Sequence, residues 1–241
     1  MFLQKINDLY IDGKISEHSR ILFVNDGSKD KTFDNLKELY EENSAYNIQV
    51  LSFSRNFGKE SAMYAGLKNS TADYVVVMDA DLQHPPAMLV DMCKAMEEGY
   101  DCCGLRRVTR KGEPPVRSFF ARQYYQIFNK ISDVELVDGA RDFRLMTRQV
   151  VDCILQMEEY NRFTKGIFSW VGFNTKWITF KTVDRQLGTT TWKFSSLFKY
   201  AIDGIACFSV TPLRFIAVMG AIIFLISLIY IIVTLIQTLF F

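Results

Sequence analysis

Two carboxylates one residue apart, Asp79 and Asp81, directly follow the apolar run at 74–78. Such a run is typical of a buried parallel strand, whose carboxyl end is where open α/β sheets bind ligands. With the amide of Gln83, these side chains offer hard oxygen ligands that suit Mg²⁺ or Mn²⁺ and, through the ion, a diphosphate. The pattern predicts a metal-assisted enzyme acting on a nucleotide. A surface loop and a phosphatase-like nucleophilic carboxylate are the alternatives.

Polar turns follow two earlier predicted strands. In the turn at 25–28, Asp26 is placed to accept an N–H of a nucleobase, although turn chemistry alone explains the same residues. After the second strand, Arg55 and Lys59 flank the start of a helix, where the helix dipole disfavours cations. A bound anion would relieve this, so we expect substrate there, with a solvated loop as the alternative.

Two later segments are basic. The stretch 106–117 carries five cations, including Arg106 and Arg117, and arginine forks match phosphate oxygens. A solvated face and attraction to anionic lipid are the alternatives. The hydroxyl-rich loop at 185–193 includes Arg185 and Lys193, which would clamp a phosphate at a membrane surface unless the loop is only a linker.

A further carboxylate, Asp142, lies just before an apolar stretch. It is a candidate base. By itself, however, its position favours a structural role, as a helix cap or as the ion-pair partner of Arg144.

The elements that position these residues alternate along the chain. We expect strands at 21–24, 48–53, 74–78 and 100–105, and helices at 31–42, 57–69 and 86–98. This order predicts a doubly wound, mostly parallel sheet flanked by helices. Further along we expect a helix at 118–131, a turn at 138–142, a strand or helix within 143–157, and a strand at 177–182.

The C-terminal part predicts attachment to a membrane. Residues 215–241 carry no charged side chain and would span about 40 Å as a helix, enough to cross a bilayer. Basic residues before this span favour a cytoplasmic soluble part. The stretch 194–209 predicts an amphipathic helix at the interface. We therefore divide the chain into a soluble domain at 1–193, an interfacial helix at 194–212 and a transmembrane helix at 213–241.

Bulk composition excludes some classes. The net charge of +1 over 241 residues gives no reason to expect a nucleic-acid partner. Five cysteines without C-x-x-C spacing favour buried thiols in a reducing compartment, and two histidines are too few for a histidine-based metal site.

Taken together, these segments resemble the family 2 glycosyltransferases of GT-A fold. Within them, the chain is similar to the polyprenyl-phosphate glycosyltransferases related to dolichol-phosphate mannose synthase and bactoprenol glucosyltransferases. The resemblance covers about residues 20–241 and is best at 24–32, 54–60, 77–86, 142–146, 162–172 and 185–193. It implies an inverting, metal-dependent transfer of a hexose from a nucleotide sugar of UDP-glucose or GDP-mannose type to undecaprenyl or dolichyl phosphate. Such an enzyme serves cell-envelope or lipid-linked glycan synthesis at the inner or plasma membrane.

The resemblance also implies roles for single residues. Asp79, Asp81 and Gln83 would bind the metal and the donor diphosphate, and Asp26 the nucleobase. Phosphates would be held by three arginines: Arg106, Arg117 and Arg185. Asp142 matches a catalytic base or acceptor-site carboxylate. Because a phosphate monoester is largely ionised near pH 7, with a second pKa of about 6, we expect loss of Asp81 to be more damaging than loss of Asp142.

The sequence departs from the family pattern in three places. Asn25 stands where aspartate is usual, the first strand with its Pro-x-Tyr/Phe-Asn-Glu loop is absent, and one membrane helix is found where relatives carry two. We therefore expect a chain truncated at its N-terminus, with a missing C-terminal helix also considered. A polysaccharide-extending family 2 enzyme and a non-catalytic paralogue are the alternatives, and homo-oligomerisation is left open.

Overall fold

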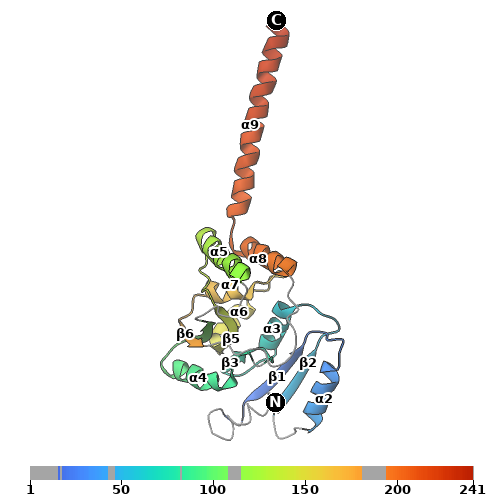
Figure 1. The fold of residues 1–241 in the computed structure, drawn as a ribbon, viewed down its shortest axis with the longest axis vertical. Coiled ribbons are helices and arrows are strands. Elements are labelled where there is room, and N and C mark those ends of the chain that lie inside the picture. Colours follow the sequence, from blue (N-terminus) through green and yellow to red (C-terminus); the bar gives the residue numbers. More distant parts are fainter. Residues whose placement is uncertain are drawn as a thin grey trace.

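The computed structural model describes residue 16 and residues 18–42, 47–81, 83–107, 115–180 and 194–240, without the side chains of 115–117 and 194–197. Strands and helices alternate through the first half (Figure 1), as expected. The order is β1 (Arg20–Asn25), α2 (Thr32–Glu42), β2 (Asn47–Ser52), α3 (Lys59–Lys68), β3 (Tyr74–Val77), a 3₁₀ turn η1 (Pro86–Met88), α4 (Leu89–Glu97) and β4 (Cys102–Arg107).

The second half adds five helices and two strands within the described residues. They are α5 (Pro115–Ile131), β5 (Ala140–Thr147), α6 (Arg148–Leu155), α7 (Thr164–Trp170), β6 (Thr175–Phe180), α8 (Phe194–Phe208) and α9 (Thr211–Phe240). The turn expected at 138–142 is wrong in its second half, because the chain turns at Gly139, at φ 81°, and Ala140 already begins β5. The stretch 143–157 contains both a strand and a helix.

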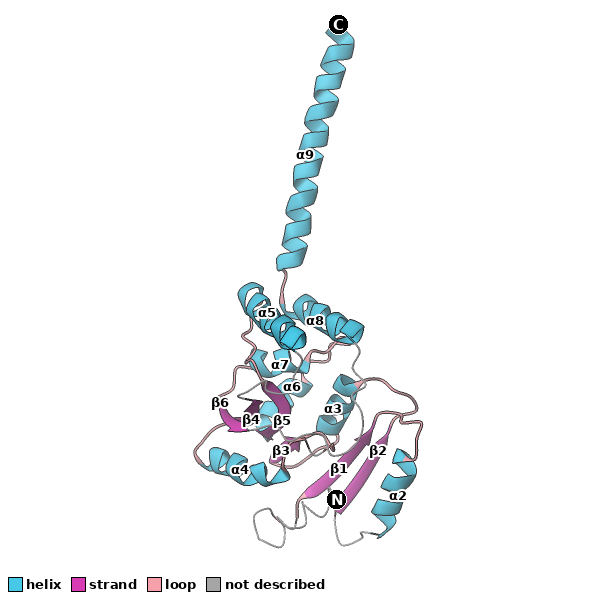
Figure 2. Ribbon diagram, viewed as in Figure 1, coloured by secondary structure: helices cyan, strands magenta, loops and turns pink. Residues whose placement is uncertain are grey.

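The strands form two sheets (Figure 2). β1 pairs in parallel with β2, and the other sheet has the order β3-β5-β4-β6. β5 runs antiparallel to both β3 and β4, whereas β4 and β6 are parallel. The α/β class with flanking helices is confirmed. The expected mostly parallel pairing is corrected to a mixed one, since β5 inserts between β3 and β4.

Helices cover both faces of the four-stranded sheet. The side chains of β5 alternate between the two faces and so contribute to both apolar clusters. Phe143 and Leu145 pack with Met92 of α4 in one apolar cluster. On the other face, Met146 packs with residues of α3, α6 and α7, including Ile154. This packing fixes β5 in the sheet, and with it the position of Asp142.

A third apolar cluster joins α5 and α8, the two helices at the base of α9 (Figure 1). Phe128 of α5 and Phe163, just before α7, are buried together with Tyr200 and Ile205 of α8 packed against them. Helix α9 extends alone from this end of the molecule (Figure 1), and none of its residues is buried. By length and composition it could cross a membrane. All five cysteines are free; Cys102 and Cys103 are buried as expected, whereas Cys207 is exposed.

Candidate active site

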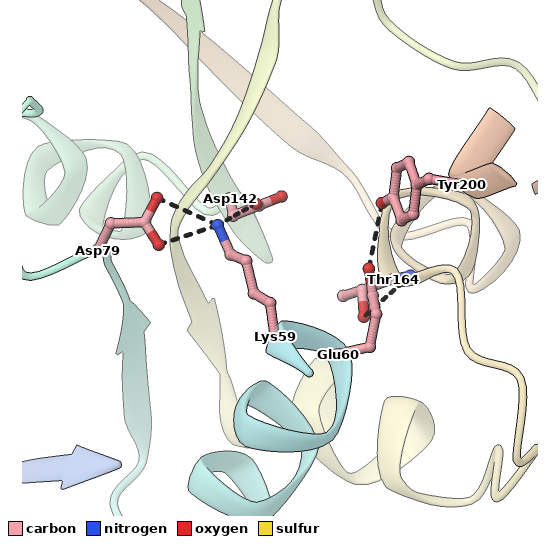
Figure 3. Close-up of polar contacts among 6 residues, drawn as sticks. All are labelled: Lys59, Glu60, Asp79, Asp142, Thr164 and Tyr200. Carbon is pink, nitrogen blue, oxygen red and sulfur yellow. Dashed lines mark hydrogen bonds and ion pairs between the residues drawn. The ribbon is translucent and has the colours of Figure 1, made fainter. Parts of the chain in front are cut away.

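One lysine joins two of the predicted carboxylates (Figure 3). Lys59, the first residue of α3, places its Nζ 2.9 Å from Oδ1 and 3.1 Å from Oδ2 of Asp79. The same Nζ lies 2.7 Å from Oδ2 of Asp142. Asp79 follows β3 and Asp142 lies in β5, and these strands pair with Val77 opposite Arg144. Pairing of β3 with β5 therefore brings Asp79 and Asp142 together, and the start of α3 adds Lys59.

The charges in this cluster stabilise one another. Burial by itself would raise the pKa of Asp142, but the cations of Lys165, Lys59 and Arg144 outweigh it and set this pKa at about 2. Burial by itself would lower the pKa of Lys59, yet Asp142 and Asp79 raise it above its ordinary value. Both groups are thus ionised at neutral pH.

The loop after β3 is fastened beyond Asp81. Oδ1 of Asp81 accepts the backbone N–H of Gln83 at 3.1 Å, which closes a tight turn. His84 is buried with its ring against those of Phe143 and Phe180. Its burial lowers the pKa of His84, so the ring is neutral and anchors the loop by packing.

The oxygen ligands of this loop fit a divalent ion that is coordinated partly by the protein and partly by a diphosphate. Within the described residues, no three acidic, histidine or cysteine side chains gather closely enough to hold an ion by themselves. Mg²⁺ bound beside phosphates usually takes only one or two carboxylates from the protein. Asp79 and Asp81 supply that number, and the Gln83 amide adds a hard oxygen.

Asp26 fastens the turn before α3. Its carboxylate accepts the N–H of Phe57 at 2.7 Å and that of Gly58 at 2.9 Å. The expected anion at this helix start is therefore provided by the protein itself. The neighbouring Gly27, at φ 60°, packs so closely that a Cβ there would lie 2.1 Å from the carbonyl carbon of Arg55. The guanidinium of Arg55 stacks over the Phe57 ring, 4.3 Å from its centroid.

The predicted phosphate-binding cations are only partly described. Nε of Arg106 donates to the carbonyl of Asp138 at 3.0 Å, and Arg106 lines a groove of about 380 Å³ together with Arg122 of α5. Arg117 lies in α5, but its side chain is not among those described, and Arg185 and Lys193 lie outside the described residues.

Sequence reasoning gave no role to Lys165 or Glu60 and only a structural one to Arg144. Arg144 was considered only as a partner of Asp142; it is 4% exposed and lies over the rings of Phe168 and Trp177, at 4.0 and 4.9 Å. Lys165 contributes the largest single charge effect on Asp142. Glu60 bonds to α7 and α8. Only their presence in the segments 54–60, 142–146 and 162–172 marked them.

The fold and the carboxylate loop together define a GT-A-like glycosyltransferase domain. Residues 11–155 match the family described as glycosyl transferase family 2, so the chain belongs to that family. Among solved structures, the chain is similar in fold to the mannosyltransferase PcManGT from Pyrobaculum calidifontis in complex with GDP-Man and Mn²⁺. The TM-score is 0.50 at 15% identity, over 77% of this chain and 54% of that one.

Curated relatives are closer in sequence. The chain is 46% identical over 219 residues to the putative glycosyltransferase CsbB of Bacillus subtilis, a match that covers 91% of this chain and 66% of that protein. It is 36% identical over 210 residues to the prophage bactoprenol glucosyl transferase homolog of Escherichia coli, covering 87% of this chain and 68% of that protein. The chain thus spans about two thirds of these relatives.

Proposed function

We propose that the chain is a membrane-bound inverting glycosyltransferase that moves a hexose from a nucleotide diphosphate sugar to a polyprenyl phosphate. The observation that carries the proposal is the joining of Asp79 and Asp142 by Lys59. This contact supports the proposal because Asp79, a proposed ligand of the metal and diphosphate, and Asp142, a proposed acceptor-site carboxylate, share one cation. The naming of a similar protein as a bactoprenol glucosyl transferase homolog supports a polyprenyl acceptor.

The proposed chemistry depends on charge neutralisation. Asp79, Asp81 and Gln83 would hold Mg²⁺ or Mn²⁺, whose charge neutralises the leaving diphosphate. Lys59 adds a fixed cation beside the same loop, where preorganised charge stabilises the transition state. Arg55, Arg106, Arg117, Arg185 and Lys193 are the proposed phosphate contacts, and Asp26 is the proposed nucleobase contact.

In this mechanism Asp142 is not a strong base. A carboxylate with a pKa of about 2 accepts protons poorly near neutral pH. The acceptor phosphate monoester, with a second pKa of about 6, is already largely dianionic there. We therefore assign Asp142 to holding Lys59 in place, which agrees with the expectation that it matters less than Asp81.

The membrane-proximal helices support an acceptor that resides in lipid. α9 would cross the inner or plasma membrane, and the basic residues before it favour a cytoplasmic site. Phe198 and Ile202 of α8 and Phe119 and Phe120 of α5 are exposed large apolar side chains on the two helices whose C-terminal ends meet the start of α9. Such side chains suit the lipid interface.

Labelled donors test the proposal directly. Membranes containing the chain are incubated with radiolabelled UDP-glucose or GDP-mannose and Mn²⁺, with Asp81→Asn as the control. We expect label in a chloroform-soluble, mild-acid-labile product from the wild type only. Label in an insoluble polymer would instead indicate polysaccharide extension, and failure to bind either nucleoside diphosphate would indicate a non-catalytic paralogue.

A further inference from the structure

Adjacent residues at the start of α3 reach opposite ends of the site (Figure 3). Lys59 contacts the carboxylates of Asp79 and Asp142. Glu60 points the other way and accepts hydrogen bonds from Thr164 at the start of α7 and from Tyr200 in α8. One helix turn therefore connects the candidate donor site with the membrane-proximal helix.

The bonding of Glu60 suits a carboxylate. Its Oε2 accepts both the backbone N–H of Thr164, at 2.9 Å, and the Thr164 hydroxyl, while Oε1 accepts the Tyr200 hydroxyl at 3.1 Å. Thr164 is buried, at 2% exposure. Burial, together with the charges of Glu60 and Asp142, raises the pKa of Tyr200 well above its ordinary value, so that its hydroxyl stays a donor.

Further close contacts of α8 lie in its C-terminal half. A Cβ added at Gly204 would lie 2.7 Å from the Tyr124 hydroxyl of α5, and one added at Gly166 of α7 would lie 2.3 Å from the ring of Phe208. α5 and α7 therefore hold the C-terminal half of α8. The Tyr200 hydroxyl adds a connection to α3 one turn earlier.

We propose that Glu60 is a positioning residue that holds α8 in register with the Lys59 end of α3, so that an acceptor delivered at the membrane meets the donor site. This inference rests on the proposed function, because it assumes an acceptor that arrives along the membrane surface. It assigns Glu60 a role exerted through α7 and α8, without contact to the substrates.

Tyr200→Phe is the cleanest test, because it removes one hydroxyl and keeps the ring in the apolar cluster. Tyr124→Phe is the matched control: Tyr124 packs in the same cluster, and its buried hydroxyl has no hydrogen-bond partner among the residues that the structure describes. Glu60→Gln is the conservative variant, since its amide oxygen keeps part of the acceptor capacity.

The first readout is kinetic, with the full chain in vesicles, UDP-glucose with Mn²⁺ as donor and undecaprenyl phosphate as acceptor. We expect Tyr200→Phe to lower kcat/KM for the acceptor about tenfold, the size of losing a hydrogen bond to a charged group, with Glu60→Gln in between. Donor affinity, measured by UDP binding, should stay within about twofold of the wild type. The proposal would be overturned if Tyr200→Phe and Tyr124→Phe had the same acceptor kcat/KM. It would also be overturned if UDP affinity fell by the same factor as acceptor kcat/KM.

The second readout does not need the reaction. Backbone hydrogen exchange in α8 should be faster in Tyr200→Phe than in Tyr124→Phe, and equal exchange would count against the connection. If the wild type transfers no sugar to undecaprenyl phosphate, the proposed function fails, and the acceptor role of Glu60 fails with it. If the wild type is active but Tyr200→Phe has the same acceptor kcat/KM as Tyr124→Phe, the positioning role alone fails.

Discussion

Nζ of Lys59 lies 2.7 Å from Oδ2 of Asp142, so an ion pair connects the first turn of α3 with β5, an inner strand of the four-stranded sheet. The Asp142 side chain is 17% exposed and the Lys59 side chain 39% exposed. The pair is therefore strengthened by partial burial but still accessible to a substrate. This arrangement leads to a prediction about stability as well as one about activity.

Acid should weaken the fold through Asp142. Because its pKa is lowered from 3.8 to about 2, its contribution is present above the unfolded value and is lost as the pH falls through the folded one. We expect a loss of about 2 kcal/mol between about pH 4 and about pH 2. Asp142→Asn should remove this part of the acid dependence, measured by thermal unfolding in EDTA. Asp152→Asn, at an exposed ion pair, is the control; the same acid slope in both variants would contradict the prediction.

Asp81→Asn should reduce sugar transfer far more than Asp142→Asn. We expect kcat to fall about 10²–10³-fold for Asp81→Asn, since this change removes a proposed ligand of the metal ion whose charge balances the diphosphate. Asp142→Asn leaves Lys59 paired with Asp79 and should cost about tenfold. Initial rates with labelled donor measure both, and near-wild-type turnover of Asp81→Asn would remove the metal assignment.

Gly27→Ala should disrupt the turn after β1, which contains Asp26, and the adjoining turn before α3. The backbone is at φ 60° and the new Cβ would meet the main chain of Arg55 at 2.1 Å. Gly99→Ala is matched for backbone conformation, at φ 89°, but has open space around the new atom. We expect about 1 kcal/mol of destabilisation for Gly99→Ala and clearly more for Gly27→Ala, with weaker UDP or GDP binding only in the latter. Equal unfolding temperatures would contradict the close packing.

Removal of residues 213–241 should release the chain from vesicles without unfolding the domain. No residue of α9 is buried, so the three apolar clusters stay intact. Flotation with vesicles and thermal unfolding measure the two effects. We expect most of the protein in the soluble fraction at a nearly unchanged unfolding temperature. Retention of the shortened chain on vesicles would place the main anchor in α5 and α8 instead.

The alternation of strands and helices up to β4 could be predicted because each strand is a short apolar run between polar turns, α2 has an apolar spacing, and two prolines mark the start of the segment that contains α4. β5 could not, because its first residues, Ala140 to Asp142, look like a charged turn in the sequence. The stretch becomes a strand through long-range pairing: Ala140 pairs with Arg106 of β4, and the rest of β5, from Arg144 on, pairs with β3 as well as β4. The antiparallel direction follows from that long-range pairing and leaves no local signal.

The candidate site was predicted as a set of residue types, and its arrangement came from the fold. Asp79 and Lys59 were identified separately, as a metal ligand and as a substrate contact, and nothing in the spacing indicated that they bond to each other. Asp26 was expected to face a ligand, but its carboxylate caps the turn before α3, and its predicted contact with a nucleobase stays a prediction. Glu60 was missed because its partners, Thr164 and Tyr200, are far away in the sequence.

The junction between α8 and α9 has a consequence for how the proposed reaction meets its acceptor. The hydroxyls of Ser209 and Thr211 both donate to the carbonyl of Ile131, at 2.5 and 3.1 Å, and the Ser132 hydroxyl donates to the carbonyl of Phe208 at 2.8 Å. The start of α9 is thus hydrogen-bonded to the C-terminal end of α5. In the proposed function, where α9 crosses the membrane, these bonds would hold the site close to the bilayer surface. Encounters of the enzyme with a lipid-borne acceptor would then take place in two dimensions, at a rate set by lateral diffusion and by the number of acceptors per unit of membrane area.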